Sequence, residues 1–154
     1  MEISELLVRG RVWYNIPGKT AVDFIEAFVE ALKVPESINK LDLSQACSRR
    51  EMSSSTAMGR GLAFPHPGTL MAIKPEDAFV ALAYPRFPVD WKAPDGAPVK
   101  AVFMVVSSSR NDHLMTLSSF AKLCGKDEFY AALTRQAPLQ DLTGLMRTGT
   151  AGKK

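Results

Sequence analysis

Apolar residues recur every three or four positions in the segment 19–34, KTAVDFIEAFVEALKV. This spacing places them on one face of a helix, so the pattern predicts an amphipathic helix there. Thr20, with Asp23 three residues later, is typical of a helix start, and Pro35 ends the element. The predicted inner face comprises Val22, Phe24, Ile25, Phe28, Val29 and Leu32.

Two further long stretches have the same period. A second helix is expected over about 37–51, which delivers Arg50 at its C-terminal end. Its expected inward positions are Ile38, Leu41 and Ala46. A third helix is expected from Asn111, with Asn111 or Asp112 as its cap and His113 in its first turn. Its expected apolar stripe is Leu114, Leu117, Phe120, Ala121 and Cys124.

Strand signals separate these helices. Residues 11–16 form an expected edge strand, which the following Pro-Gly pair stops. The segments 62–64, 78–84 and 99–107 are expected to be further strands. In 99–107 both alternating faces are apolar, and this pattern suits a central strand that is covered on both sides.

The order of these elements indicates the fold class. Two shorter periodic stretches, 126–133 and 139–146, predict closing helices, and the polar tail 148–154 is expected to be flexible. Helices and strands are interleaved along the chain. We therefore expect an α/β fold, an αβα sandwich in which a mixed sheet of about five strands is flanked by helices on both faces.

Composition narrows the function classes. The 154 residues suit one domain, and 46% hydrophobic with 23% charged residues is ordinary for a soluble protein. The formal charge is only +3 and the cations are scattered, which argues against nucleic-acid binding. No apolar run reaches the roughly 20 residues of a membrane span, and the N-terminus lacks the apolar core of an export signal. We expect a cytoplasmic protein in which Cys47 and Cys124 are free thiols.

His66, one of two histidines, lies between two prolines in the segment 50–68, REMSSSTAMGRGLAFPHPG. Pro65 and Pro67 restrict φ and lack an N–H group, so the backbone around His66 is stiff. Two glycines upstream leave room for another backbone or a partner protein to approach. His66 is therefore either a structural or exposed histidine, or one whose imidazole is held in place for chemistry.

Most reactions that use a histidine also need a recognisable motif of other residues, and this sequence lacks those motifs. There is no spacing typical of metal ligands, no GxSxG elbow and no GxxxxGK[ST] phosphate loop. A neutral imidazole can instead attack phosphorus and carry the phosphoryl group covalently. Such a site needs positive charge or hydrogen-bond donors at the phosphoryl oxygens, for which Arg50, His113 and Thr56 are candidates. The sequence equally allows Arg50 as a solvated helix-end cation, His113 as an exposed residue and Cys47 as a small buried one.

The segment 50–66 is similar to the signature of the enzyme IIA domains of the fructose/mannitol class, which belong to the bacterial phosphoenolpyruvate-dependent phosphotransferase system. The pattern is RExxxSTxxGxGxAxPH, carried by Arg50, Glu51, Ser55, Thr56, Gly59, Gly61, Ala63, Pro65 and His66. The segment 113–123, HLMTLSSFAKL, resembles the family's second histidine-led helix, and 87–106 follows its run into the central strand. The likeness covers about residues 3–147, which we expect to form an enzyme IIA type-2 domain.

The resemblance implies that His66 is phosphorylated and that His113 and Arg50 line the same site. Ser55 and Thr56 are the expected phosphate-binding residues. The implied donor is a histidine-phosphorylated carrier protein, and the implied acceptor is a IIB domain or a regulated target protein. No metal or nucleotide cofactor is expected.

The lone domain favours the nitrogen-regulatory branch of the family. Three positions depart from the pattern: Pro67, Ser54 and Ala57 stand where glycine is common. Pro67 removes a backbone N–H that phosphate could use, so the choice of donor or the transfer rate could differ. The alternative function is an interaction module that regulates a target enzyme, kinase or transporter, with phosphorylation as its switch or with no phosphate at all.

Overall fold

A five-stranded sheet organises the protein, with the strand order β1-β4-β5-β3-β2. The structure is a computed structural model and describes residues 2–151. The strands are β1 (Val12–Ile16), β2 (Ala57–Gly59), β3 (Leu62–Ala63), β4 (Phe79–Pro85) and β5 (Ala101–Val106). The pairs β1–β4 and β3–β5 are parallel, whereas β4–β5 and β2–β3 are antiparallel. The sheet is therefore mixed, with β1 at one edge, as predicted.

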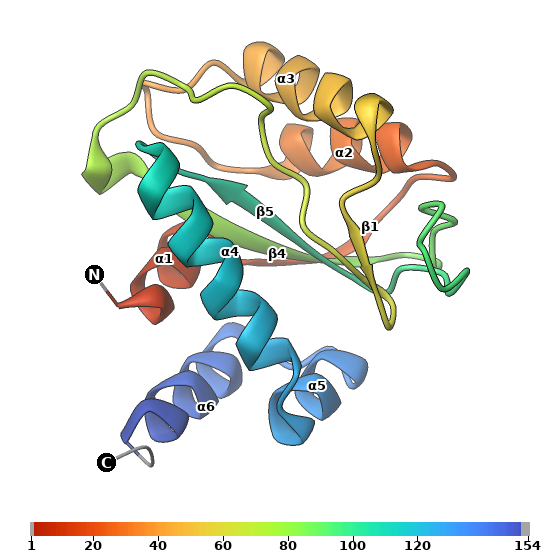
Figure 1. The fold of residues 1–154 in the computed structure, drawn as a ribbon, viewed down its shortest axis with the longest axis vertical. Coiled ribbons are helices and arrows are strands. Elements are labelled where there is room, and N and C mark those ends of the chain that lie inside the picture. Colours follow the sequence, from red (N-terminus) through yellow and green to blue (C-terminus); the bar gives the residue numbers. More distant parts are fainter. Residues whose placement is uncertain (1, 152–154) are drawn as a thin grey trace.

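Helices cover both faces of this sheet (Figure 1). They are α1 (Ile3–Gly10), α2 (Ala21–Ala31), α3 (Lys40–Ser53), α4 (Arg110–Cys124), α5 (Asp127–Thr134) and α6 (Leu139–Ala151), with a short 3-10 turn, η1 (Pro75–Asp77). One core cluster joins α2 and α3 to one face, and a second cluster joins α1, α4, α5 and α6 to the other. The predicted αβα sandwich is confirmed.

The two faces of β5 show why this strand is central. Phe103 and Val105 are buried in the cluster that holds α4, whereas Met104 and Val106 are buried in the cluster that holds α2. Every residue of β5 is buried. A strand covered on both faces needs apolar residues at consecutive positions, which explains the unbroken run in the sequence.

The N-terminal helix α1 is an element that the sequence analysis did not predict. Its buried residues Leu6, Leu7 and Gly10 follow a helical period, so the signal was present. Gly10 lies against β4: a Cβ atom there would come 2.0 Å from the carbonyl oxygen of Val80. Glycine is required at this position because helix and strand backbones approach so closely.

The strand β2 was also missed, because β2 and β3 form a tight hairpin of very short strands. Gly59, Arg60 and Gly61 all have positive φ angles, of 88°, 57° and 79°. The carboxylate of Asp95 accepts a hydrogen bond from the Arg60 amide at 2.8 Å and stabilises this turn. The hairpin turn therefore needs the two glycines for its own backbone conformation. This structural role is independent of any partner protein that approaches there.

Helix starts were predicted with mixed success. The Thr20 hydroxyl accepts a hydrogen bond from the Asp23 amide at 3.1 Å, so the predicted start of α2 is confirmed. The prediction for α3 was wrong by three residues, because Asn39 caps it. The cap of α4 is Ser109, and neither Asn111 nor Asp112.

Two leucines predicted to face inward are exposed. Leu41 is 65% exposed because the inward stripe of α3 runs through Leu43 and Cys47, and Leu41 lies off that stripe. Leu114 of α4 is 56% exposed, while Phe120 is buried as predicted. Both cysteines, Cys47 and Cys124, are buried free thiols, as predicted.

The last helix is longer than predicted. We expected a helix over 139–146 and a flexible tail over 148–154, but α6 continues to Ala151. Residues 152–154 of the predicted tail lie outside the described residues.

Candidate phosphoryl-transfer site

Two parallel strands bring the two histidines to one edge of the sheet. In the parallel pair, Leu62 of β3 lies opposite Ala101 of β5. The pairing continues past β3, because the Val105 amide donates to the Pro65 carbonyl at 3.0 Å. His66 therefore follows the carboxyl end of one strand, and α4 begins just beyond the carboxyl end of the other. The carboxyl ends of neighbouring parallel strands are a common place for sites in α/β proteins.

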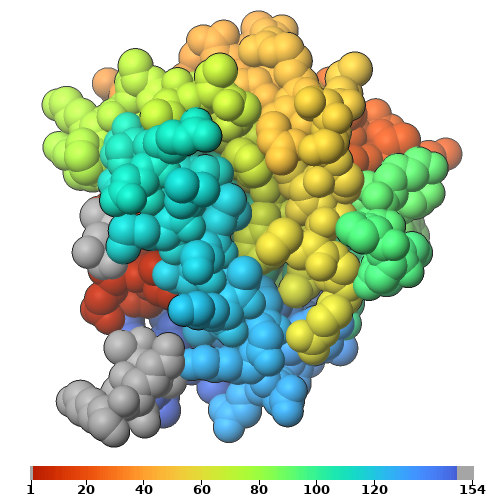
Figure 2. Space-filling view, in the orientation of Figure 1, coloured from red at the N-terminus to blue at the C-terminus, as the bar shows by residue number. Residues whose placement is uncertain are grey.

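His66 and His113 lie together at this edge. Their ring centroids are 4.5 Å apart, with an angle of 51° between the ring planes. Both side chains are half-buried and line one open pocket of about 570 Å³. In Figure 2 the yellow-green segment that follows β3 lies between the gold helix α3 and the teal helix α4. The structure thus brings together the two predicted histidines.

A backbone hydrogen bond fixes the protonation pattern of His66. Its Nδ1 atom lies 2.9 Å from the carbonyl oxygen of Phe64. A carbonyl oxygen can only accept, so we assign the ring proton to Nδ1. In the neutral ring the lone pair is then on Nε2.

Both histidines favour their neutral forms. Burial lowers the pKa of His66; the hydrogen bond to Phe64 opposes this effect, and the positive charge of Arg50 adds to it. Burial also lowers the pKa of His113 to about 4, with further lowering by the neighbouring His66, Arg110 and Arg50. At neutral pH, His66 therefore has a ring nitrogen that is available for nucleophilic attack.

Arg50 and Arg110 supply positive charge at the pocket. Arg50 lies in the last turn of α3 and lines the pocket with both histidines. The Nη1 atom of Arg50 donates to the Ser54 carbonyl oxygen at 2.7 Å. The aliphatic part of Arg50 lies close to Gly68, where an added Cβ atom would be 3.4 Å from it. One end of the guanidinium is thus held, and the pocket has a cation from each of two helices.

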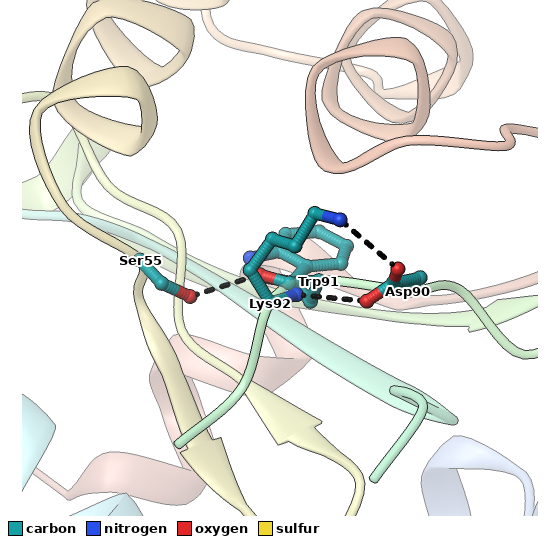
Figure 3. A network of polar contacts seen from close by, with 4 residues as sticks. All are labelled: Ser55, Asp90, Trp91 and Lys92. Atoms are coloured by element: carbon teal, nitrogen blue, oxygen red, sulfur yellow. Dashed lines mark hydrogen bonds and ion pairs between the residues drawn. The ribbon is translucent and has the colours of Figure 1, made fainter. Parts of the chain in front are cut away.

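The structure does not bring Ser55 and Thr56 into this pocket. The buried Thr56 donates its hydroxyl to Glu51 at 2.6 Å, and its amide donates to the same carboxylate at 2.7 Å. The Ser55 hydroxyl donates to the Trp91 carbonyl at 3.1 Å (Figure 3). It also accepts from the Ala57 amide at 3.1 Å. Both residues hold the segment between α3 and β2, which directly follows the helical turn that carries Arg50.

Arg110 is the pocket residue that sequence reasoning missed. It is the first residue of α4 and precedes His113 by three positions, so one helical turn places both side chains toward the pocket. The spacing was visible in the sequence, but the wrong cap at Asn111 put Arg110 outside the helix. The carbonyl of Phe64 was also missed, and a backbone group leaves no signal in the side-chain pattern.

The comparison of the sequence with known families assigns the chain to one of them. Residues 5–147 match the family described as "Phosphoenolpyruvate-dependent sugar phosphotransferase system, EIIA 2". The chain belongs to this family. It is thus a phosphoryl-transfer component of that system, with a phosphocarrier or regulatory role.

Relatives of two kinds support this assignment. The chain is 33% identical over 131 residues to the "PTS system fructose-specific EIIABC component" of Bacillus subtilis, covering 83% of this chain and 20% of that protein. It therefore spans about a fifth of the length of that curated relative. It is 30% identical over 142 residues to the "Nitrogen regulatory protein" of Pseudomonas aeruginosa, covering 90% of this chain and 89% of that one.

A solved structure shares the fold along almost the whole chain. The nitrogen regulatory protein IIA-Ntr from Neisseria meningitidis superposes with a TM-score of 0.79 at 25% identity, covering 94% of this chain and 98% of that one. Within residues 2–151, none of the helices combines the length and the apolar composition that crossing a membrane requires.

Proposed function

We propose that residues 3–147 form a phosphotransferase domain in which Nε2 of His66 accepts a phosphoryl group. The observation that carries this assignment is the hydrogen bond from Nδ1 to the Phe64 carbonyl. It leaves Nε2 as the nitrogen with the lone pair, on a ring that lines the cationic pocket. Pro65 and Pro67 restrict the backbone on either side, so the ring keeps one orientation.

The transfer exchanges one N–P bond for another. The Nε2 lone pair attacks phosphorus in line, and the N–P bond of the donor phosphohistidine breaks with its electron pair returning to the donor ring. Positive charge then develops on the His66 ring. The Phe64 carbonyl stabilises it by accepting the Nδ1 proton in a hydrogen bond that strengthens as the charge grows.

Charge on the phosphoryl oxygens is stabilised from both sides of His66. Arg50 approaches from the C-terminal end of α3, and Arg110 from the N-terminal end of α4. The positive end of the α4 dipole adds to these charges. His113, neutral because of its lowered pKa, acts as a hydrogen-bond donor or acceptor beside His66.

Ser55 and Thr56 act on phosphate indirectly in this proposal. Thr56 keeps the buried carboxylate of Glu51 satisfied, and Ser55 anchors the segment to Trp91. Both contacts fix the end of α3, from which Arg50 extends. Their hydroxyls are committed to protein groups, and neither residue lines the pocket of His66.

The donor in this proposal is a histidine-phosphorylated carrier protein. The acceptor is a IIB domain, as the name of the fructose-specific EIIABC relative suggests, or a regulated target, as the name of the nitrogen regulatory relatives suggests. The match to a nitrogen regulatory protein, which covers 89% of that relative, favours the regulatory branch.

Intact-mass spectrometry tests the acceptor residue. The protein is incubated with phosphoenolpyruvate and the general phosphotransferase proteins, and wild type is compared with His66→Gln and His113→Gln. We expect one acid-labile phosphoryl group on wild type, none on His66→Gln, and slower gain of the same group on His113→Gln. A phosphoryl group retained by folded His66→Gln would contradict the assignment.

A second function, target binding switched by phosphate, is favoured by the apolar rim of the pocket. Leu70 is 53% exposed and Leu114 is 56% exposed, and both line the pocket beside His66. Exposed apolar groups around a charged centre suit protein docking, and a phosphate there would change the interface charge by about −2. Binding of a regulated target to His66→Gln as well as to unphosphorylated wild type would show that docking does not need the acceptor.

A further inference from the structure

Trp91 carries a buried hydrogen-bond donor that has no acceptor. The side chain is 1% exposed, and its Nε1 atom has no hydrogen-bond partner within the described part of the chain. Its ring stacks edge-on against Phe24 at 5.7 Å, so its orientation is fixed by packing. A buried N–H group without a partner is unfavourable by about 1–3 kcal/mol, and native folds pair the large majority of such groups.

Trp91, which carries the unpaired donor, lines a second pocket that shares no lining residue with the pocket of His66. This pocket, of about 350 Å³, lies between the C-terminal end of α3 and the N-terminal end of α2. Figure 3 shows the indole nitrogen on the side of the ring turned toward Ser55 and the end of α3, away from the Asp90 carboxylate. Trp91, Ser55 and Asp90 all line the pocket.

The acceptors in this pocket are already occupied. The Asp90 carboxylate accepts from the Lys92 amide at 3.1 Å and lies 3.3 Å from its ammonium group. Both oxygens of Glu51 accept hydrogen bonds from Thr56. Both carboxylates therefore already accept hydrogen bonds from the protein itself.

Among the residues that the structure describes, a hydrogen-bond donor and a cation of this pocket have no partner. Lys19 lines the pocket and forms no ion pair within residues 2–151. The first turn of α2, at Ala21 and Val22, also lines the pocket and directs the positive end of the helix dipole toward it. An indole N–H, an ammonium group and a helix N-terminus together select an acceptor that carries negative charge.

The geometry points to a binding site for a small carboxylate between α2 and α3, held by the Trp91 indole N–H, Lys19 and the N-terminal end of α2. This site is separate from the pocket of His66 and does not depend on phosphoryl transfer. Its occupant would contact Ser54 and Ser55, the segment whose Ser54 carbonyl holds Arg50.

Nuclear magnetic resonance of the ¹⁵N-labelled full chain tests the site directly, because the sequence has only two indole groups. The Trp13 indole donates to the Gly10 carbonyl at 2.8 Å and serves as an internal reference. The probe is sodium acetate, and the controls are acetamide, its neutral counterpart, and sodium chloride at matched ionic strength. Single Trp→Phe variants assign the two indole signals.

We expect acetate to move the Trp91 indole proton downfield in a saturable way while the Trp13 signal stays in place. Lys19→Gln, a change at an exposed side chain, should weaken acetate binding by about tenfold because a charge-assisted contact is lost. Lack of a saturable shift, an equal response to acetamide or chloride, or unchanged affinity in Lys19→Gln would overturn the proposal. Phosphoryl acceptance by His66 is measured separately, so failure of either proposal leaves the other intact.

Discussion

The rings of His66 and His113 lie 4.5 Å apart, although 47 positions separate them in the sequence. Two neutral imidazoles can lie this close, whereas two imidazolium ions would repel each other strongly. The positive charge of the site is instead placed on the two arginines, whose guanidinium groups keep their charge at any physiological pH. The neutral imidazoles and the positive charge of the pocket are thus on different residues.

The pH profile of transfer follows from the neutral ring of His66. Its pKa is lowered from the ordinary value of 6.5, so the rate of single-turnover transfer should be constant above that pH. It should fall only as the pH drops through the lowered pKa, because the protonated ring has no lone pair at Nε2. Arg50→Gln removes one lowering influence and should move the midpoint upward. A midpoint at or above 6.5 in wild type would disagree with the burial of this ring.

Arg50 should matter through its shape as well as its charge. Arg50→Lys keeps the positive charge but loses the planar fork, one end of which is held by Ser54. We expect Arg50→Lys to slow phosphorylation by about tenfold and Arg50→Gln by about 10²-fold or more, in line with loss of one oxyanion contact. Rapid-quench measurement of phosphorylated protein gives both rates. Equal rates in wild type and Arg50→Gln would remove Arg50 from the site.

Stability should depend on pH through His113. Its pKa is lowered from 6.5 to about 4 in the folded protein, so between these values the unfolded chain binds more protons. The contribution of neutral His113 is fully present above pH 6.5 and is lost as the pH falls toward 4. Urea unfolding across this range should show a steeper loss of the free energy of unfolding in wild type than in His113→Gln. Parallel curves for the two proteins would show that His113 titrates normally.

Thr56 should prove structural when stability and transfer are measured together. Thr56→Val removes the hydroxyl that donates to Glu51 and leaves a buried carboxylate oxygen unpaired. The free energy of unfolding should fall by about 1–3 kcal/mol, while Thr56→Ser, which keeps the hydroxyl, should lose less. If Thr56→Val has the free energy of unfolding of wild type but no longer accepts phosphate, then Thr56 contacts the phosphate directly.

Two glycine substitutions in helices should have opposite effects. Gly10→Ala places a methyl group 2.0 Å from the Val80 carbonyl oxygen, and should lower the free energy of unfolding by about 1–3 kcal/mol or more through overpacking. Gly144→Ala, inside α6, meets nothing within 4 Å and should stabilise the fold by about 0.5–1 kcal/mol. Thermal unfolding of both variants measures these effects. A similar loss of stability in the two variants would mean that the close approach of α1 to β4 is not rigid.

Periodicity predicted the long elements well, because burial on one or two faces leaves a repeating signal. The apolar run at β5 is an example. The start of α2 was predicted from a local capping motif, Thr20 with Asp23. The hairpin of β2 was missed because strands of two or three residues are too short to show a period. Leu41 was misplaced because it was grouped by helical spacing with Ile38, which precedes α3, whereas the inward stripe of α3 runs through Leu43 and Cys47.

The site was predictable only in part, for a different reason. The proline pair and the family resemblance singled out His66, and the second histidine-led segment singled out His113. Their meeting depends on the parallel pairing of β3 with β5, which no local pattern encodes. The hydroxyls of Ser55 and Thr56 could not be assigned from sequence, because their acceptors at Trp91 and Glu51 are set by how the segment folds back.

The pairing of β3 with β5 also links folding to activity. Arg50, His66 and His113 come from three separate segments, and they share a pocket only once this long-range strand pair and both flanking helices have formed. Contacts between residues distant in sequence form late and are lost when the sheet opens. A partly folded chain would therefore carry all three residues without the pocket that they share, so the candidate site exists only in the folded protein.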